Sequence, residues 1–139
     1  MGNTGTQDVS ESGSTSRVIE LFASDPNGAD LTIGDGKVFW VCPETYNNHT
    51  ISSFHTAVTQ SSSSGVPTTQ FANVTLGLDI LSTKATIDVS ETTSYTAAVQ
   101  PVINESNNTI TTGDLLRVDV DVAGTGTKGL IALFTLTPP

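Results

Sequence analysis

The sequence predicts an all-β fold, an antiparallel β-sandwich of jelly-roll-like type that carries a flexible N-terminal arm. The chain has 139 residues, a length that fits one domain with a single core. Short runs rich in Val, Ile, Leu and Thr follow one another at roughly 8 to 12 residue spacing, divided by Gly, Asn, Asp, Ser and Pro clusters. These runs do not alternate with long helical patterns, so a parallel sheet is not expected.

Residues 1–16 differ in composition from the rest of the chain. Met1 and Val9 are the only apolar members of this segment, and Gly, Ser, Thr and other polar residues make up most of it. Such a segment cannot bury enough apolar surface to fold alone. We therefore expect an extended arm over 1–16, ordered by a partner, and a β-sandwich domain over 17–139.

Seven strands are expected along this domain. We place them at 18–22, 38–42, 51–59, 68–75, 85–89, Leu115–Val122 and 130–136, and a short strand over 29–33 is compatible with the pattern. Two segments favour a single helical turn instead, 78–81 and 94–99, the second with Ser94 as its cap and Pro101 as its stop. Strand-forming segments dominate, as in a two-sheet sandwich.

The segment Leu115–Val122 gives the clearest strand pattern. Val118, Val120 and Val122 alternate with charged residues, which predicts one buried and one solvated face. We expect this strand to form a hairpin with 130–136, because the connection contains three glycines that can adopt tight-turn conformations. The predicted core aromatics are Trp40, Phe54, Phe71 and Phe134, surrounded by Ile87, Val118, Val120 and Leu133.

Two further segments are interpreted as hairpin connections. The Ser-Ser-Ser-Ser-Gly-Val-Pro segment at 61–67 predicts an exposed, flexible hairpin loop between two strands. The Gly-Asp-Gly-Lys segment at 34–37 precedes an aromatic strand and predicts a tight hairpin turn. A phosphate-binding loop is not expected there, because the spacing of that motif and a following helix are both missing.

The charge of the chain restricts its partners. Fourteen acidic residues stand against five basic ones, a formal net charge of -9. No basic surface is therefore expected to neutralise phosphates, and nucleic acid is not a predicted partner. An acidic surface could instead steer the protein toward a basic patch on another protein. Residues 1–6 lack the regions of a secretory signal, so we expect synthesis in the cytoplasm and predict no membrane partner.

Few side chains offer catalytic chemistry. Cys42 is the single cysteine and lies in an apolar run, which predicts a buried thiol that behaves as a small hydrophobe. His49 and His55 are the only histidines, and we expect the first in a turn and the second in a strand, so they do not converge on one metal. A nucleophile elbow is missing from the sequence, so serine hydrolase chemistry is not predicted.

Three carboxylates offer the hard oxygen atoms that calcium prefers. Asp114, Asp119 and Asp121 are close in sequence, but their spacing does not match an EF-hand loop. Asp119 and Asp121 share one face of their strand, which predicts a solvated outer surface or a surface that complements a basic partner. We therefore predict no enzymatic activity, no metal site and no cofactor.

Several turns of the chain resemble a module of tailed-bacteriophage structural proteins. The resemblance rests on Gly-Asp-Gly-Lys at 34–37 before an aromatic strand, Pro43 after it, Thr-Gly-Asp at 112–114 before the alternating strand, and Lys-Gly-Leu at 128–130. It covers residues 33–136 and leaves the arm outside. The module resembles the jelly-roll or related β-sandwich domains of capsid cement (decoration) proteins, head fibres and tail appendages. Its motif consists of turn and core positions, so it implies no active-site residue.

This resemblance implies a structural role on the virion surface after synthesis in the host cytoplasm. The implied function is that of a cement or decoration protein that binds the major capsid protein and stabilises its lattice. A homo-oligomer is implied as well, and a trimer suits the three-fold positions of such a lattice. The alternative is a carbohydrate- or receptor-binding appendage, with the Tyr-Asn-Asn-His loop at 46–49 as the binding loop and Tyr95 as a less suggestive second position.

Overall fold

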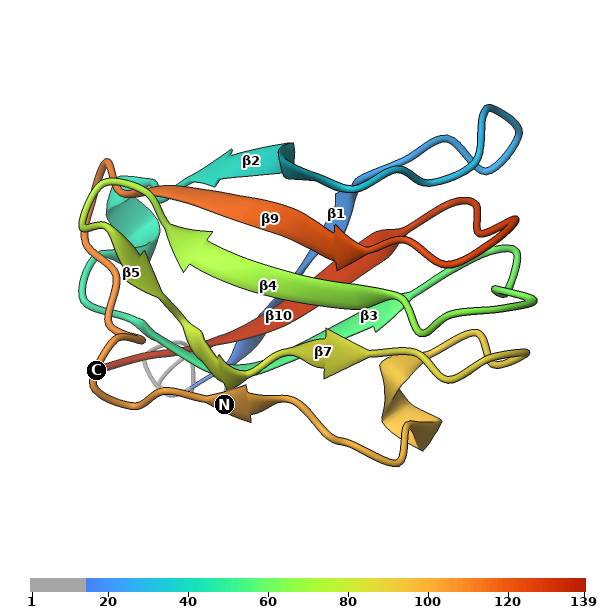
Figure 1. Cartoon of the computed structure of the whole chain (residues 1–139). Coiled ribbons are helices and arrows are strands. Elements are labelled where there is room, and N and C mark those ends of the chain that lie inside the picture. The colour runs from blue at the N-terminus through green and yellow to red at the C-terminus, as the bar shows by residue number, and fades with distance from the viewer. Residues whose placement is uncertain (1–14) are drawn as a thin grey trace, which may run out of the picture.

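The computed structural model describes residues 15–139, which form two antiparallel sheets packed face to face (Figure 1). Of the predicted arm, only Thr15 and Ser16 lie within the described residues. The first sheet has the strand order β1 (Arg17–Phe22), β10 (Ile131–Thr137), β3 (Thr50–Ala57). The second has the order β2 (Gly34–Val41), β9 (Leu115–Val122), β4 (Thr68–Asn73), β5 (Leu78–Asp79), and β7 (Ala85–Thr86) also pairs with β4.

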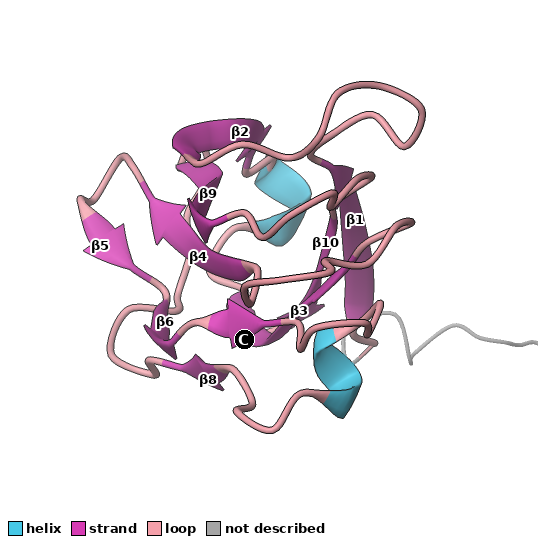
Figure 2. Ribbon diagram, turned by 45° about the vertical axis from the view of Figure 1, so that its right-hand side comes forward, coloured by secondary structure: helices cyan, strands magenta, loops and turns pink. Residues whose placement is uncertain are grey.

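The remaining elements are short and lie at the edges of the sandwich (Figure 2). The strands β6 (Leu81–Thr83) and β8 (Val102–Ile103) form a two-stranded ladder. Two 3-10 turns, η2 (Glu44–Tyr46) and η3 (Ser94–Thr96), complete the described part of the chain. The second of them packs beside β3, at the open edge of the first sheet.

The connectivity is that of a jelly roll. The chain passes from β1 in the first sheet to β2 in the second, returns to β3, and crosses again to β4. Near the end, β9 lies in the second sheet and β10 in the first. Successive strands that change sheets in this way define a double-sheet jelly roll, so the all-β, jelly-roll-like prediction is confirmed.

Aromatic side chains from both sheets meet in the core. Phe54 of β3 stacks on Phe71 of β4 with ring centroids 4.8 Å apart, and Phe134 of β10 lies 4.9 Å from Phe71. Trp40 packs edge-on against Phe134 at 5.3 Å but remains partly exposed. The predicted core aromatics are therefore correct, as are Ile87, Val118 and Val120. Leu133 is the exception, because it lies on the outer face of its strand and is only half-buried.

The predicted terminal hairpin is wrong. β9 pairs with β2 and β4, whereas β10 pairs with β1 and β3, so the connection 123–129 crosses from one sheet to the other. Its glycines serve this crossing: Gly124 has φ +74°, and a Cβ there would lie within 3 Å of the Ser62 side chain. Glycine content indicated a tight connection but could not tell a hairpin from a crossover.

The serine-rich loop at 61–67 is also a crossover, between β3 and β4, and part of it is buried. The Ser62 hydroxyl donates to the carbonyl oxygens of Ser64 and Gly65 and accepts from the N–H of Thr125 at 3.1 Å. The N–H of Ser63 donates to the Thr125 carbonyl at 3.0 Å. These bonds hold the two crossover loops together at one end of the sandwich, so the loop is not the free hairpin that was predicted.

The Gly-Asp-Gly-Lys segment begins a strand instead of turning a hairpin. Gly34 pairs with Val120 and Val38 with Val118, so the register shifts between them and the intervening residues form a β-bulge. Gly36, at φ +72°, occupies a backbone conformation that suits glycine. The Phe39 ring lies over this residue, where an added Cβ would meet it at 2.8 Å.

Smaller predictions differ from the structure at the strand margins. Residues 29–33 form no strand, the strand predicted at 85–89 is limited to Ala85–Thr86, and β8 was not foreseen. The segment 78–81 forms strand residues and not a helical turn. A 3-10 turn does lie at Ser94–Thr96, but the Ser94 side chain does not cap it. Val122 is 41% exposed although its alternation with Val120 predicted burial.

Candidate functional site

The outer face of the first sheet carries five apolar residues among nine and a single carboxylate. Three cross-strand rows cover it, formed by Phe22, Ile131 and Ala57, by Glu20, Leu133 and His55, and by Val18, Thr135 and Ser53. We call these nine residues the hydrophobic face. Phe22 is 70% exposed and Val18 61% exposed, although both lie in a regular strand. Glu20 is the single carboxylate of the three rows, in a chain of net charge -9.

A histidine, a serine and a tyrosine meet at the β3 edge of this face. His55 Nδ1 lies 2.8 Å from the Ser94 hydroxyl, which also accepts the N–H of Thr56 at 2.9 Å. The hydroxyl has one proton and two lone pairs, so Nδ1 accepts from it in one imidazole tautomer and donates to it in the other. The Tyr95 ring stacks on the imidazole with centroids 3.9 Å apart. Desolvation by burial lowers the pKa of His55 below its ordinary value, which favours the neutral imidazole over the imidazolium.

The serine of this pair is not placed for nucleophilic attack. Ser94 has no exposed surface, so a substrate carbonyl cannot reach its hydroxyl. The hydroxyl also holds η3 against β3 through the N–H of Thr56. The sequence order of these residues gave no indication of the contact, which joins positions 39 residues apart. We interpret the Ser–His contact as a structural hydrogen bond.

The outer face of the second sheet carries an ion pair whose carboxylate is buried and whose guanidinium is partly exposed. Asp119, 5% exposed, lies 2.7 Å from Arg117 Nε and accepts the N–H of Gly36 at 2.9 Å. Asp35 lies 3.8 Å from the same guanidinium. The contact with Asp119 raises the pKa of Arg117 above its ordinary value, so the side chain stays protonated. The prediction of a solvated Asp119 is therefore wrong, because the bulge and the arginine cover it.

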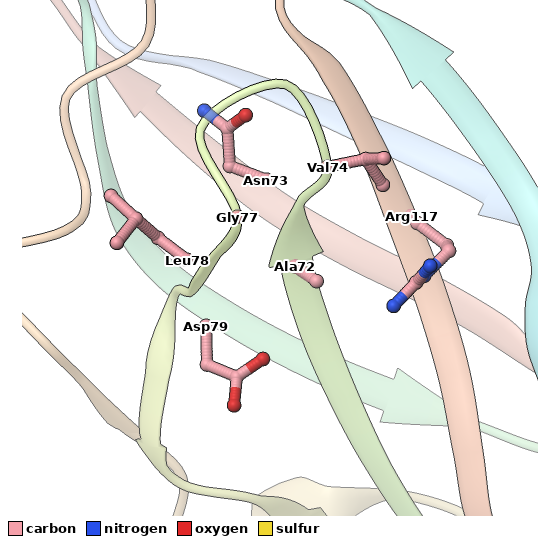
Figure 3. Close-up of a pocket in the computed structure, with 7 residues that line it drawn as sticks. All are labelled: Ala72, Asn73, Val74, Gly77, Leu78, Asp79 and Arg117. Carbon is pink, nitrogen blue, oxygen red and sulfur yellow. The ribbon is translucent and has the colours of Figure 1, made fainter.

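A pocket of about 220 Å³ opens beside this arginine (Figure 3). Arg117 and Asp79 lie on either side of Ala72, which pairs with Arg117 in β9 and with Asp79 in β5. The hairpin between β4 and β5 forms the remaining wall, with Asn73, Val74, Gly77 and Leu78. No residue of this pocket was singled out from the sequence as a ligand-binding residue, because the register between three strands brings them together.

Asp114, Asp119 and Asp121, the three carboxylates close in sequence, have separate roles. Asp114 is buried and accepts hydrogen bonds from Asn73 Nδ2 and the N–H of Thr111, both at 3.0 Å. Asp121 pairs with Lys84 at 2.7 Å near the surface. Among residues 15–139, no group of three or more His, Cys, Asp or Glu side chains could hold a metal ion.

The loop at 46–49 lines a second pocket, of about 370 Å³, together with Thr15, Arg17, Thr45 and the two C-terminal prolines. Tyr46 is half-buried, 6.2 Å from Trp40 and 5.2 Å from His49 between ring centroids. Asn47 does not offer its amide oxygen to a ligand, because that atom accepts the N–H of Thr112 at 2.9 Å. Of the four residues of this loop, Tyr46 and His49 line the pocket, and Asn47 and Asn48 do not.

Cys42 is buried, as predicted. Its side chain belongs to the core, and burial raises the pKa of its thiol, with a smaller contribution from the negative charge of Asp114. A thiol in this state is a poor nucleophile at neutral pH. No helix within the described residues is long and apolar enough to cross a membrane.

The chain was compared with family models, with curated proteins and with solved structures. None of the three comparisons gave a match.

Proposed function

We propose that this protein is a non-enzymatic structural component of a virion surface, a cement or decoration protein that binds the major capsid protein. The observation that carries the proposal is the hydrophobic face. Exposed Phe22 and Val18 on a regular sheet, with one carboxylate among nine residues, form the kind of patch that proteins use to bind one another.

The size of this face favours attachment in many copies. Three strands about 4.8 Å apart and rows about 6.6 Å apart give a flat area of only about 300 Å². Stable pairwise complexes bury about 800 Å² on each partner. A single copy therefore binds weakly, and a repeated lattice or a homo-oligomer such as a trimer multiplies the contacts. A decoration protein meets this condition, because the capsid offers the same site many times.

The proposal is tested by particle binding of two matched variants. Phe22→Ser removes an aromatic side chain from the hydrophobic face, and Phe39→Ser removes one, 51% exposed, from the outer face of the second sheet. Each full-length variant is sedimented with intact particles that lack the endogenous protein, and the bound copies are counted. We expect Phe22→Ser to reduce occupancy strongly and Phe39→Ser to leave it near the wild-type level. Equal occupancy in both variants, or no binding of the wild type, contradicts the proposal.

A carbohydrate- or receptor-binding appendage is the second candidate. It is favoured by the pocket that Tyr46, His49 and Arg17 line, because aromatic and cationic groups at one opening suit a sugar. A glycan array with the wild type and with His49→Ala tests it. Selective binding that is lost in His49→Ala would support the appendage. If the array shows no binding, the decoration role remains as the single candidate function.

A further inference from the structure

The pocket beside Arg117 contains a donor and an acceptor that do not pair with each other. Arg117 forms ion pairs with Asp119 and Asp35, and within the described residues none joins it to Asp79. The two side chains stand on β9 and β5, with β4 between them, so their strands are about 10 Å apart. Guanidinium N–H groups on one side and carboxylate oxygens on the other therefore face a common space above Ala72 (Figure 3).

The position of the arginine is fixed before any ligand arrives. Asp119 lies 2.7 Å from Nε in an ion pair, although the Nε–H does not point along a hydrogen bond to it, and Asp119 itself accepts the N–H of Gly36 in the bulge. Phe39 pairs with Arg117 across the strands and packs over Gly36. A side chain held in this way loses little conformational freedom on binding, which is a condition for a specific site.

The local charge selects against anionic ligands. One guanidinium stands among Asp35, Asp79 and Asp119, so anions such as phosphate meet a net negative site. Two of the carboxylates are already engaged by Arg117, which leaves a single free carboxylate, Asp79, opposite the donor. A neutral ligand that donates on one side and accepts on the other satisfies both groups.

We propose that this pocket binds a neutral sugar, one hexose ring, through two adjacent hydroxyl groups. One hydroxyl accepts from Arg117, and its neighbour donates to Asp79, because a hydroxyl can act in both ways. The C–H side of the ring packs on Val74, which is 39% exposed, whereas Ala72 is 4% exposed and only closes the floor of the pocket. A volume of about 220 Å³ has room for one such ring. The site is independent of particle binding, since it lies on the other sheet.

The experiment is a nuclear magnetic resonance titration of the full chain with glucose, galactose, mannose and N-acetylglucosamine. We expect at least one of them to shift the amide signals of Ala72, Val74, Gly77 and Arg117 in a saturable way. Asp79→Asn removes the charged acceptor without leaving a buried group unpaired and is expected to weaken that binding by about tenfold. Glu44→Gln, an exposed carboxylate outside the pocket, is the matched control and retains wild-type affinity.

Three outcomes overturn the inference. The first is the absence of saturable shifts at millimolar concentrations of all four sugars. The second is equal affinity of Asp79→Asn and the wild type. The third is a set of shifts confined to Tyr46 and His49, which would assign sugar binding to the second pocket. Loss of particle binding in Phe22→Ser has no bearing on these results, so the two proposals fail separately.

Discussion

The two outer faces of the sandwich are built from the same alternation of residues but differ in shape and charge. The first sheet is regular between β1 and β10, and its outward residues form a flat apolar surface. In the second sheet a bulge at Gly36 and a turned β4–β5 hairpin create a cover for Asp119 and a pocket beside Arg117. Local irregularity thus builds a site for a small ligand, whereas the regular pairing of β1 with β10 offers a docking surface.

The largest expected effect tests the alternation on which this comparison rests. Val120 is 1% exposed beneath the second sheet, and Asp121 is partly exposed beside Lys84. Val120→Asp should lower the free energy of unfolding by about 4 kcal/mol or more, because it buries an unpaired charge. Asp121→Asn should change it by less than about 1 kcal/mol. Urea denaturation measures both, and similar losses would mean that the strand faces are wrongly assigned.

The second-largest expected effect tests the ion pair of Arg117 with the buried Asp119 on the outer face of the second sheet. Asp119→Ala removes the acceptor for Gly36 and the partner of Arg117, and should cost about 2–3 kcal/mol of stability. The double variant Asp119→Ala, Arg117→Met should recover part of this loss, since it no longer leaves the guanidinium without its partner. A double variant as unstable as the sum of both single changes would show that the pair does not act as a unit.

The third prediction concerns the pH dependence of stability, to which His55 contributes on the first sheet. The folded-state pKa of His55 is lowered by burial, whereas a histidine in the unfolded chain titrates near the ordinary pKa of 6.5. The unfolded chain therefore binds more protons below about pH 6.5, and stability falls as the pH decreases through that range. Above that pH the contribution of His55 is fully present. Urea denaturation of the wild type and His55→Gln across this range should show that the variant lacks this part of the acid loss; identical pH profiles would contradict it.

The smallest expected effect separates binding from stability on the hydrophobic face. Phe22 is mostly exposed, so Phe22→Ser should change the unfolding free energy by less than about 0.5 kcal/mol. Thermal denaturation of this variant should superimpose on the wild type while particle binding is lost. A markedly lower melting temperature would indicate that Phe22 supports the fold, and its effect on binding would then need another explanation.

Much of the fold could be predicted from local patterns, because the alternation of apolar and polar residues can be recognised within each strand alone. Val118 and Val120 are buried as their alternation indicates, and Phe54, Phe71 and Phe134 form the core. Pairing could not be predicted, since the glycines of a crossover and of a hairpin look alike in sequence.

The sites depend on that pairing, which limits what the sequence could reveal of them. The sequence around Asp119 predicts a solvated carboxylate, because its neighbours give no sign that the N–H of Gly36, 83 positions away, donates to it. The contact of His55 with Ser94 spans 39 positions and was missed for the same reason. The hydrophobic face likewise exists only once β1 and β3 flank β10.

The pairing of β1 with β10 has a mechanical consequence. Arg17 at the start of β1 pairs with Leu136 near the end of β10. The N-terminal end of β1 and the C-terminal end of β10 therefore lie side by side at one end of the sheet. A force that pulls these two ends apart peels β1 from β10 one residue pair at a time. A force directed along β1 from its other end would instead load all six pairs together. The domain should therefore unfold at low force when it is pulled by the start of β1 and the end of β10. It should resist a higher force when it is pulled through the loop after Phe22.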